Sequence, residues 1–308
     1  MDQAKMEPAT ISGFAQRLMS GRFTVTAELV PPVSTDPADL AARALPLKGH
    51  VAAVNVTDGA GARAHLSSLV AAHLLLQNGI EPILQMACRD RNRLALESDL
   101  LGALALGVRN LLVLTGDDPK AGNQPEAKPV FDLDSRALLA LARRLGAERK
   151  LPPDTPVDGA TELFLGATDL PIDPPPGWAP TALAEKAACG ARFVQTQFCF
   201  DMDVVRRYAA RLAEHGLGER IKLLIGVAPI PSARSARWML DKLYGTIIPD
   251  AVIARLDGAA DARREGIRIC AELLHELATI PGVAGAHVMA PQNPSAIPEA
   301  IAAAGLTA

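Results

Sequence analysis

Residues 111–120 read LLVLTGDDPK, an apolar run that stops at a glycine and two adjacent carboxylates. A short apolar run bounded by turn residues is typical of a buried strand. In sheets of parallel strands, the carboxyl ends of the strands meet on one face, where binding sites form. The segment therefore predicts a buried parallel strand that ends at a functional site.

Similar runs recur along the whole chain and alternate with longer amphipathic stretches, as expected for strands joined by crossover helices. We expect eight strands, at 23–30, 51–56, 81–86, 110–114, 162–167, 192–198, 222–227 and 285–289. Since the composition does not break at any midpoint, this pattern favours a closed (β/α)8 TIM barrel over an open doubly wound sheet.

We expect a single domain, residues 1–308, with two additions to the barrel. Residues 1–20 carry spaced apolar side chains and predict an extra helix that plugs the barrel bottom or packs beside it. Residues 244–280 predict a helical insertion before the last strand. The long segments 116–131 and 168–181 follow strands, and long ordered loops there are often binding elements.

Composition excludes several classes of protein. The 308 residues are 49% hydrophobic and 21% charged, and 31 Lys+Arg against 34 Asp+Glu give a net charge of -3. No basic excess favours nucleic acid, and no run reaches the ~20 apolar residues of a membrane helix. The N-terminal residues do not resemble a secretory signal, and the four cysteines are widely spaced. We expect a cytoplasmic protein with reduced thiols.

Polar residues at the strand ends are the candidates for chemistry: Glu28, Asn55, Thr57, Asp58, Gln85, Thr115, Asp117, Gln197 and His287. Glu28 is the most informative, because it lies between Ala27 and Leu29 with no basic residue after Arg22 in its segment. Desolvation favours the neutral carboxyl, so its pKa should rise and it could act as a general acid. Pairing with a distant arginine, or exposure to solvent, is the alternative.

Asp117 could be a helix cap, a metal ligand or a functional anion, and Asp118 could be merely solvated. Gly116 before them lets the backbone approach a flat ligand. Glu28, Asp58, Asp90 and Asp117 could converge on a metal, but no HxH or HExxH pair supports one, and we expect none. The phosphate-loop patterns GxGxxG and GxxxxGK[ST] and the hydrolase pattern GxSxG are absent.

Four motifs in order, AELVPP, NVTDGAGA, LQMACRDRNR and VLTGDDP, resemble the methylenetetrahydrofolate reductase family, as does TQF at 196–198. The resemblance covers about residues 21–305. It implies a FAD-containing (β/α)8 barrel that passes a hydride from NAD(P)H to 5,10-methylenetetrahydrofolate and gives 5-methyltetrahydrofolate, in one-carbon and methionine metabolism. We expect small-molecule substrates and a homo-oligomer.

The resemblance also implies roles for single residues. Glu28 matches the general acid that opens the methylene bridge to the iminium, and Asp117 an aspartate near both flavin and pterin. Gln197 matches a substrate-binding glutamine. The resemblance implies nine cofactor positions: Thr57, Asp58, Ala60, Gln85, Thr115, Gly116, Asp117, Phe131 and Lys186. Three of them depart from the family, in which position 85 is often histidine, position 115 often arginine and position 131 often tyrosine.

Further departures lie at Ala182 and Glu185, where the family has asparagine and arginine, and at Asn293, where an arginine often meets folate. Two other readings stay open. One is a flavin-free barrel lyase that uses Glu28 and Asp117 as acid and base. The other is a reductase-like subunit that has no activity of its own and binds a partner.

Overall fold

Eight parallel strands close into a barrel in a computed structural model that describes residues 11–290 and 293–306. Around the barrel the order is β1, β10, β9, β8, β7, β4, β3 and β2. The predicted (β/α)8 architecture is confirmed. The strands are β1 (Thr24–Leu29), β2 (Ala53–Val56), β3 (Pro82–Ala87), β4 (Asn110–Leu114), β7 (Phe164–Asp169), β8 (Phe193–Phe198), β9 (Lys222–Val227) and β10 (Val283–Met289).

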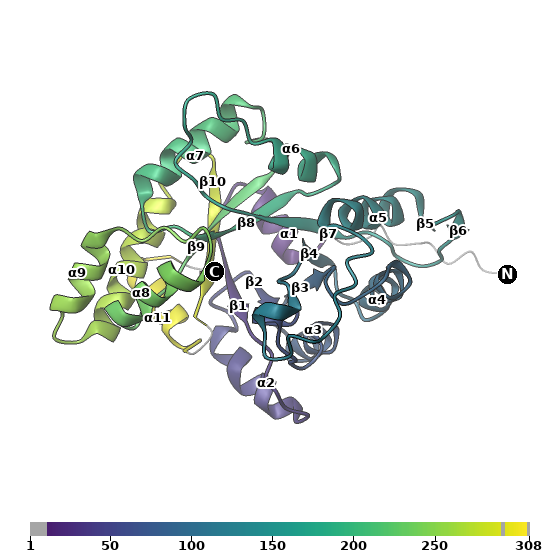
Figure 1. Ribbon diagram of the computed structural model, residues 1–308, viewed down its shortest axis with the longest axis horizontal. Helices are drawn as coiled ribbons and strands as arrows, with labels where there is room; N and C mark the ends of the chain where they lie inside the picture. Colours follow the sequence, from purple (N-terminus) through teal and green to yellow (C-terminus); the bar gives the residue numbers. More distant parts are fainter. Residues whose placement is uncertain (1–10, 291–292, 307–308) are drawn as a thin grey trace.

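Helices surround the strands (Figure 1). They are α1 (Gly13–Met19), α2 (Pro37–Ala44), α3 (Ser68–Gln77), α4 (Arg93–Ala105), α5 (Ser135–Glu148), α6 (Thr181–Ala188), α7 (Met202–Glu214), α8 (Ala233–Lys242), α9 (Asp250–Gly258), α10 (Ala262–Leu277) and α11 (Ala296–Ala303). Helices α9 and α10 form the expected helical insertion before the last strand. A small hairpin, β5 (Lys150–Leu151) with β6 (Thr155–Pro156), was not expected from the sequence.

Strand residues alternate between the helices and the barrel interior, as the period of two requires. Val25, Ala27 and Leu29 of β1 belong to the large core between strands and helices, whereas Thr24, Thr26 and Glu28 occupy the alternate positions. A separate apolar cluster fills the bottom of the interior; it consists of Phe14, Leu18, Ala53, Ile83, Leu112, Phe193 and Leu224.

Helix α1 plugs the bottom of the barrel. The sequence had allowed this position or one beside the barrel. The Phe14 ring lies 5.2 Å from Phe193 and 5.7 Å from Phe164, edge to face in both pairs. Polar contacts fix the helix: the Ser12 hydroxyl donates to Asn110 Oδ1 at 2.6 Å, and the Phe14 amide donates to Glu81 Oε1 at 2.9 Å. Edge-to-face ring pairs add about 0.5–1.5 kcal/mol each beyond their burial.

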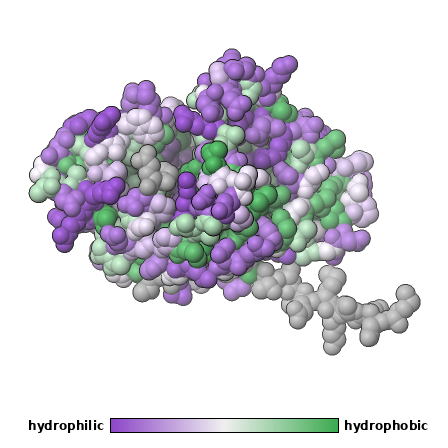
Figure 2. Space-filling view, turned by 90° about the horizontal axis from the view of Figure 1, so that it is seen from below, coloured by the Kyte–Doolittle hydropathy of each residue, from purple (hydrophilic) through white to green (hydrophobic). Residues whose placement is uncertain are grey.

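The outer surface mixes polar and apolar residues. Figure 2 shows more hydrophilic surface toward the left of the view and more apolar surface toward the right. Exposed apolar side chains on the outer helices include Val70 of α3 with Leu94 and Leu101 of α4. Within the described ranges, no helix has the length and apolar character to cross a bilayer.

Candidate active site at the carboxyl ends of the strands

Glu28 lies at the carboxyl end of β1 and meets two side chains from other strands. Gln85 Nε2 of β3 is 3.4 Å from Glu28 Oε2, and His287 Nε2 of β10 is 3.7 Å from the same oxygen. The Glu28 side chain is 20% exposed, and that of His287 is 4% exposed. The Glu28 carboxyl is therefore partly exposed at the barrel mouth, and on its other side it faces the amide of Gln85 and the imidazole of His287. No arginine of the described chain pairs with it.

Asp58, expected at a cofactor position, is held by a buried ion-pair cluster. Arg91 donates to both Asp58 oxygens, at 2.6 and 3.1 Å, and the Ala87 amide donates to Oδ2 at 2.8 Å. Arg91 Nε also lies 2.9 Å from Asp99 of α4. Burial lowers the pKa of Arg91, but the hydrogen bond and charge of Asp58 outweigh it and the pKa is raised. This cluster ties the ends of β2 and β3 to α4.

Arg89 is a buried cation at this end of β3, and it supports the loops after β2 and β4. Its Nη1 donates to the Gly59 carbonyl at 3.2 Å, and its Nη2 to Asp90 at 3.1 Å. Gly116 packs directly on Arg89, since a Cβ at 116 would lie 2.9 Å from Arg89 Cβ. With a φ of +89°, residue 116 also needs the left-handed freedom of glycine.

Asp117 and Asp118 differ in their surroundings, although both are exposed. Asp118 is a cap: its Oδ1 accepts from the Lys120 amide at 2.9 Å at the start of the short helix η3 (Pro119–Ala121). Asp117 has no hydrogen-bond or ion-pair partner in the part of the chain that the structure describes. The helix-cap role that was one alternative for Asp117 is therefore filled by Asp118. Its carboxylate remains available to a ligand.

Two residues at the mouth, Thr57 and Lys186, offer polar groups to a ligand. The Thr57 hydroxyl at the end of β2 is buried, and it lacks a hydrogen-bond partner among the described residues. A buried hydroxyl without a partner is rare and suits a ligand atom. Lys186 of α6 donates to the Thr168 carbonyl at the end of β7 at 2.6 Å, and an ammonium has three donors. Its neighbour Glu185 pairs with Arg136 of α5 at 2.5 Å.

Gln197 lies on a bulge at the end of β8, where the register with β9 shifts between Gln195 and Phe198. Bulges re-aim side chains and are frequent beside active sites. The Phe198 amide donates to Gln197 Oε1 at 3.0 Å, so the side-chain nitrogen is the group left to meet a ligand. Gly226 of β9 permits the bulge, because a Cβ there would lie 2.4 Å from the Thr196 carbonyl oxygen.

The remaining predicted positions lie on loops around the same face. Ala60 begins the short helix η2 (Ala60–Ala62) after β2, and Thr115 is exposed directly after β4. Phe131 is 38% exposed with a φ of +43°, which is uncommon for a bulky residue. The amide of its neighbour Val130 donates to the Arg89 carbonyl at 2.7 Å, so this segment also reaches the end of β3.

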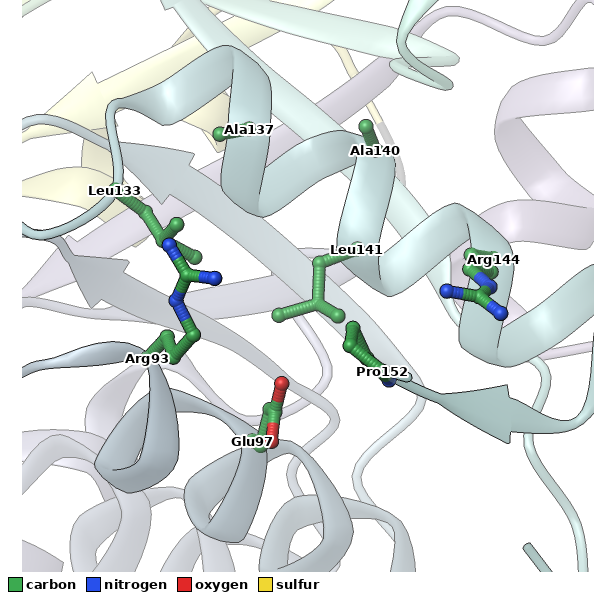
Figure 3. Close-up of a pocket in the computed structure, with 8 residues that line it drawn as sticks. All are labelled: Arg93, Glu97, Leu133, Ala137, Ala140, Leu141, Arg144 and Pro152. Carbon is green, nitrogen blue, oxygen red and sulfur yellow. The ribbon is translucent and has the colours of Figure 1, made fainter. Parts of the chain in front are cut away.

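A surface pocket of about 260 Å³ lies elsewhere, between α4 and α5 on the outside of the barrel (Figure 3). Leu133, Leu141 and Pro152 form an apolar floor, and Glu97 projects toward it. The two arginines at its rim already have partners, Arg93 in Asp132 and Arg144 in Glu148 and Asp154. Since none of the strand-end candidates lines it, we place the candidate site at the mouth of the barrel.

Four residues that build the site were not among the candidates taken from the sequence: Thr26, Arg89, Arg91 and Gln195. A signal for two of them was present. In CRDRNR the arginines at 89 and 91 alternate directly after a strand, as inward-facing strand residues do. Thr26 and Gln195 gave no such signal, because polar residues inside an apolar strand reveal their partners only after the barrel closes.

Comparisons with known proteins give one clear relationship. A sequence model described as methylenetetrahydrofolate reductase matches residues 13–305. A Caenorhabditis elegans protein named "probable methylenetetrahydrofolate reductase (NADPH)" is 25% identical over 248 residues, which are 78% of this chain. The chain spans only about a third, 34%, of that relative's length.

Among solved structures, tryptophan synthase from M. tuberculosis is similar at 15% identity. Its aminoacrylate-bound form gives a TM-score of 0.43, covering 88% of this chain and 99% of that one. A ligand-free mutant form gives 0.44, covering 89% and 99%.

Proposed function

The chain belongs to the methylenetetrahydrofolate reductase family, and on this premise we propose that it is a flavin-dependent oxidoreductase. It interconverts 5,10-methylenetetrahydrofolate and 5-methyltetrahydrofolate with NAD(P)H as the hydride donor. The observation that carries the proposal is the position of Glu28 at the barrel mouth, beside Gln85 and His287. The cytoplasmic location and the homo-oligomeric state belong to the same proposal.

Glu28 acts as the general acid. Its carboxyl transfers a proton to a nitrogen of the methylene bridge, so that the bridge opens to the reactive iminium. The carboxylate left behind faces the side-chain nitrogens of Gln85 and His287, which are the donors available to it. A positioned acid of this kind contributes typically about 10²–10⁴-fold to a rate.

Asp117 supplies a fixed negative charge near the cationic iminium. Its carboxylate has no protein partner in the described residues, so its charge is not already neutralised. A charge that is in place before the reaction stabilises a developing cation without reorganisation at the moment of reaction. Gln197, re-aimed by the bulge, offers its amide nitrogen to the pterin edge.

Thr57, Gly116 and Lys186 would hold FAD at this mouth, with Asp58, Ala60, Gln85, Thr115 and Phe131 around it. FAD supplies the hydride-transfer chemistry between NAD(P)H and folate when it is bound. The Thr57 hydroxyl offers one polar contact, and Lys186 offers positive charge to the diphosphate. Gly116 keeps a side chain out of the approach to the loop after β4.

An absorbance scan of the purified protein, followed by NADH or NADPH addition, tests the proposal. We expect the yellow spectrum of oxidised flavin, bleaching by a reduced nicotinamide and reoxidation by 5,10-methylenetetrahydrofolate. Colourless protein that turns over a folate without a redox change would favour the lyase. Colourless protein active only in a complex would favour the partner subunit. Either result refutes the flavin enzyme.

Two variants assign the roles in stopped-flow measurements of the separate half-reactions. Glu28→Gln should abolish folate reduction and leave flavin reduction by NAD(P)H largely intact, since only the former needs the acid. Asp117→Asn should weaken folate turnover and make the flavin easier to reduce. Glu97→Gln, in the outer pocket, is the matched control and should behave as the wild type. Equal loss of both half-reactions in Glu28→Gln, or an unchanged midpoint potential in Asp117→Asn, contradicts the assignments.

A further inference from the structure

Four polar side chains cross the interior of the barrel directly below Glu28, and all are at most 3% exposed: Thr26, Asn55, Gln195 and His287. Beneath them lies the apolar cluster around Phe14 and Phe193. Buried polar groups persist only when they are hydrogen-bonded, and a connected network of them fixes its members strongly. The four residues form such a network, which we call the interior polar tier.

Hydrogen bonds connect the four members of the interior polar tier in a chain. Asn55 and Gln195 pair through their amides, with Nδ2 to Oε1 at 2.5 Å and Nε2 to Oδ1 at 3.0 Å. Gln195 Nε2 also donates to Thr26 Oγ1 at 3.0 Å. Thr26 Oγ1 therefore accepts a hydrogen on the side that faces Gln195.

The Thr26 hydroxyl therefore has its own hydrogen left to donate. Two acceptors are near: His287 Nδ1 at 3.0 Å and the Ala286 carbonyl at 3.4 Å. The shorter contact has the normal length of a hydrogen bond, and the longer one is at the limit. With Nδ1 accepting, a neutral imidazole carries its hydrogen on Nε2, and that nitrogen faces Glu28 Oε2 at 3.7 Å.

We propose that His287 is a positioning residue for Glu28, held by Thr26 as the neutral Nε2–H tautomer so that this N–H is aimed at the carboxyl. The inference rests on the proposed function, and it names the group that receives the carboxylate when Glu28 gives up its proton. The Glu28 O–H bond breaks, a nitrogen–hydrogen bond forms on the folate, and the imidazole keeps its own proton throughout.

The surroundings of Glu28 leave this role to His287. Across the ladders on either side, Glu28 is in register with Asn55 of β2 and Met289 of β10, and neither is ionisable. Gln85 of β3 is the other donor, also uncharged. In the described part of the chain, His287 is the one basic side chain within ion-pair distance of the Glu28 carboxyl.

The interior polar tier also indicates from which side of the barrel Glu28 regains its proton. Below His287 the network ends in the Asn55–Gln195 amide pair, and apolar side chains lie under it. An amide pair does not readily pass a proton on, so the described residues offer His287 no source of protons from below. Glu28 is reprotonated from the mouth, and His287 orients it without acting as a relay.

Nitrogen-15 NMR of the wild-type holoenzyme tests the tautomer directly. His287→Gln identifies the signals of this ring among the six histidines, because its signals disappear in the variant. We expect a neutral ring with the proton on Nε2 at pH 7. A proton on Nδ1, or a charged ring at that pH, overturns the proposal, whatever the protein's activity proves to be.

Two substitutions of His287 then test the role in the folate half-reaction. Glutamine can place an amide donor near the position of Nε2, whereas asparagine reaches only the position of Nδ1. A hydrogen bond to a charged group is worth about 1.5–3 kcal/mol, so His287→Asn should slow folate reduction roughly 10- to 150-fold. Flavin reduction by NAD(P)H should be unchanged, and His287→Gln should retain most of the rate.

Thr26→Val is a third variant, which leaves the histidine in place but removes the hydroxyl that orients it. We expect slower folate reduction and signals of both tautomers in the NMR spectrum. Equal rates in the wild type, His287→Asn and Thr26→Val overturn the proposal, as does equal loss in the glutamine and asparagine variants. A wild-type protein with no folate turnover at all would instead refute the proposed function.

Discussion

Replacing Arg91 by methionine removes the centre of the ion-pair cluster that joins β2, β3 and α4. The side chain of Arg91 is 21% exposed, and those of Asp58 and Asp99 are 7% and 33% exposed. Methionine preserves much of the volume but leaves the Asp58 carboxylate with the Ala87 amide as its one donor among the described residues. Breaking a buried pair on one side costs about 3–5 kcal/mol, because the remaining charge stays buried.

We expect Arg91→Met to lose about 3–5 kcal/mol of unfolding free energy in urea titrations at pH 7. Arg93→Met is the matched control, since Arg93 pairs with Asp132 at the surface with side chains 55% and 36% exposed. Such exposed pairs contribute about 0–1 kcal/mol. Equal losses in the two variants would refute the reasoning that burial makes the Arg91 cluster contribute more to the free energy of unfolding than an exposed pair.

The pH dependence of the same variant provides a second check. Burial raises the pKa of Asp99 even in the presence of Arg91, whose charge acts in the opposite direction. A carboxyl with a raised pKa binds a proton more readily in the folded chain than in the unfolded one, so lowering the pH favours folding. Without Arg91 this effect should grow. The deficit of Arg91→Met relative to the wild type should therefore shrink between pH 7 and pH 5, and a deficit that widens would contradict this account.

Three further predictions concern other parts of the molecule. Phe14→Ala removes a fully buried ring from the barrel bottom and should cost about 3–5 kcal/mol in urea unfolding, while the rates of both half-reactions change little. Burial raises the pKa of the thiols of Cys88 to about 11 and of Cys199 and Cys270 to about 12, so iodoacetamide at pH 8 should first label the half-buried Cys189, as read by peptide mass spectrometry. Tyr208→Phe removes the donor to Asp169 and should cost about 1–3 kcal/mol, with faster proteolysis within residues 168–181; unchanged cleavage would show that Tyr208 does not hold that loop.

The strands could be predicted because their signals are local. The run at 110–114 coincides with β4, and the run at 222–227 coincides with β9. The position of α1 could not be predicted, because the partners of Phe14 lie at Phe164 and Phe193, far along the sequence. Local apolar spacing shows that a helix has a face to bury but does not show where.

The candidate site shows the same limit. Glu28 could be singled out because its own segment offers no cation, and the structure places Gln85 and His287 beside it. Those neighbours come from β3 and β10, which meet β1 or face it only when the barrel closes. That Asp58 pairs with Arg91 could likewise be known only once β2 lies beside β3. Partners across strands are the information that a linear pattern lacks.

The bottom plug has a consequence for synthesis on the ribosome. Phe14 leaves the ribosome early, but its ring partner Phe193 is made 179 residues later. At about 5–20 residues per second, this delay is roughly 10–35 s. During that time the apolar face of α1 lacks its last ring partner, and a nascent-chain chaperone would find it incompletely covered.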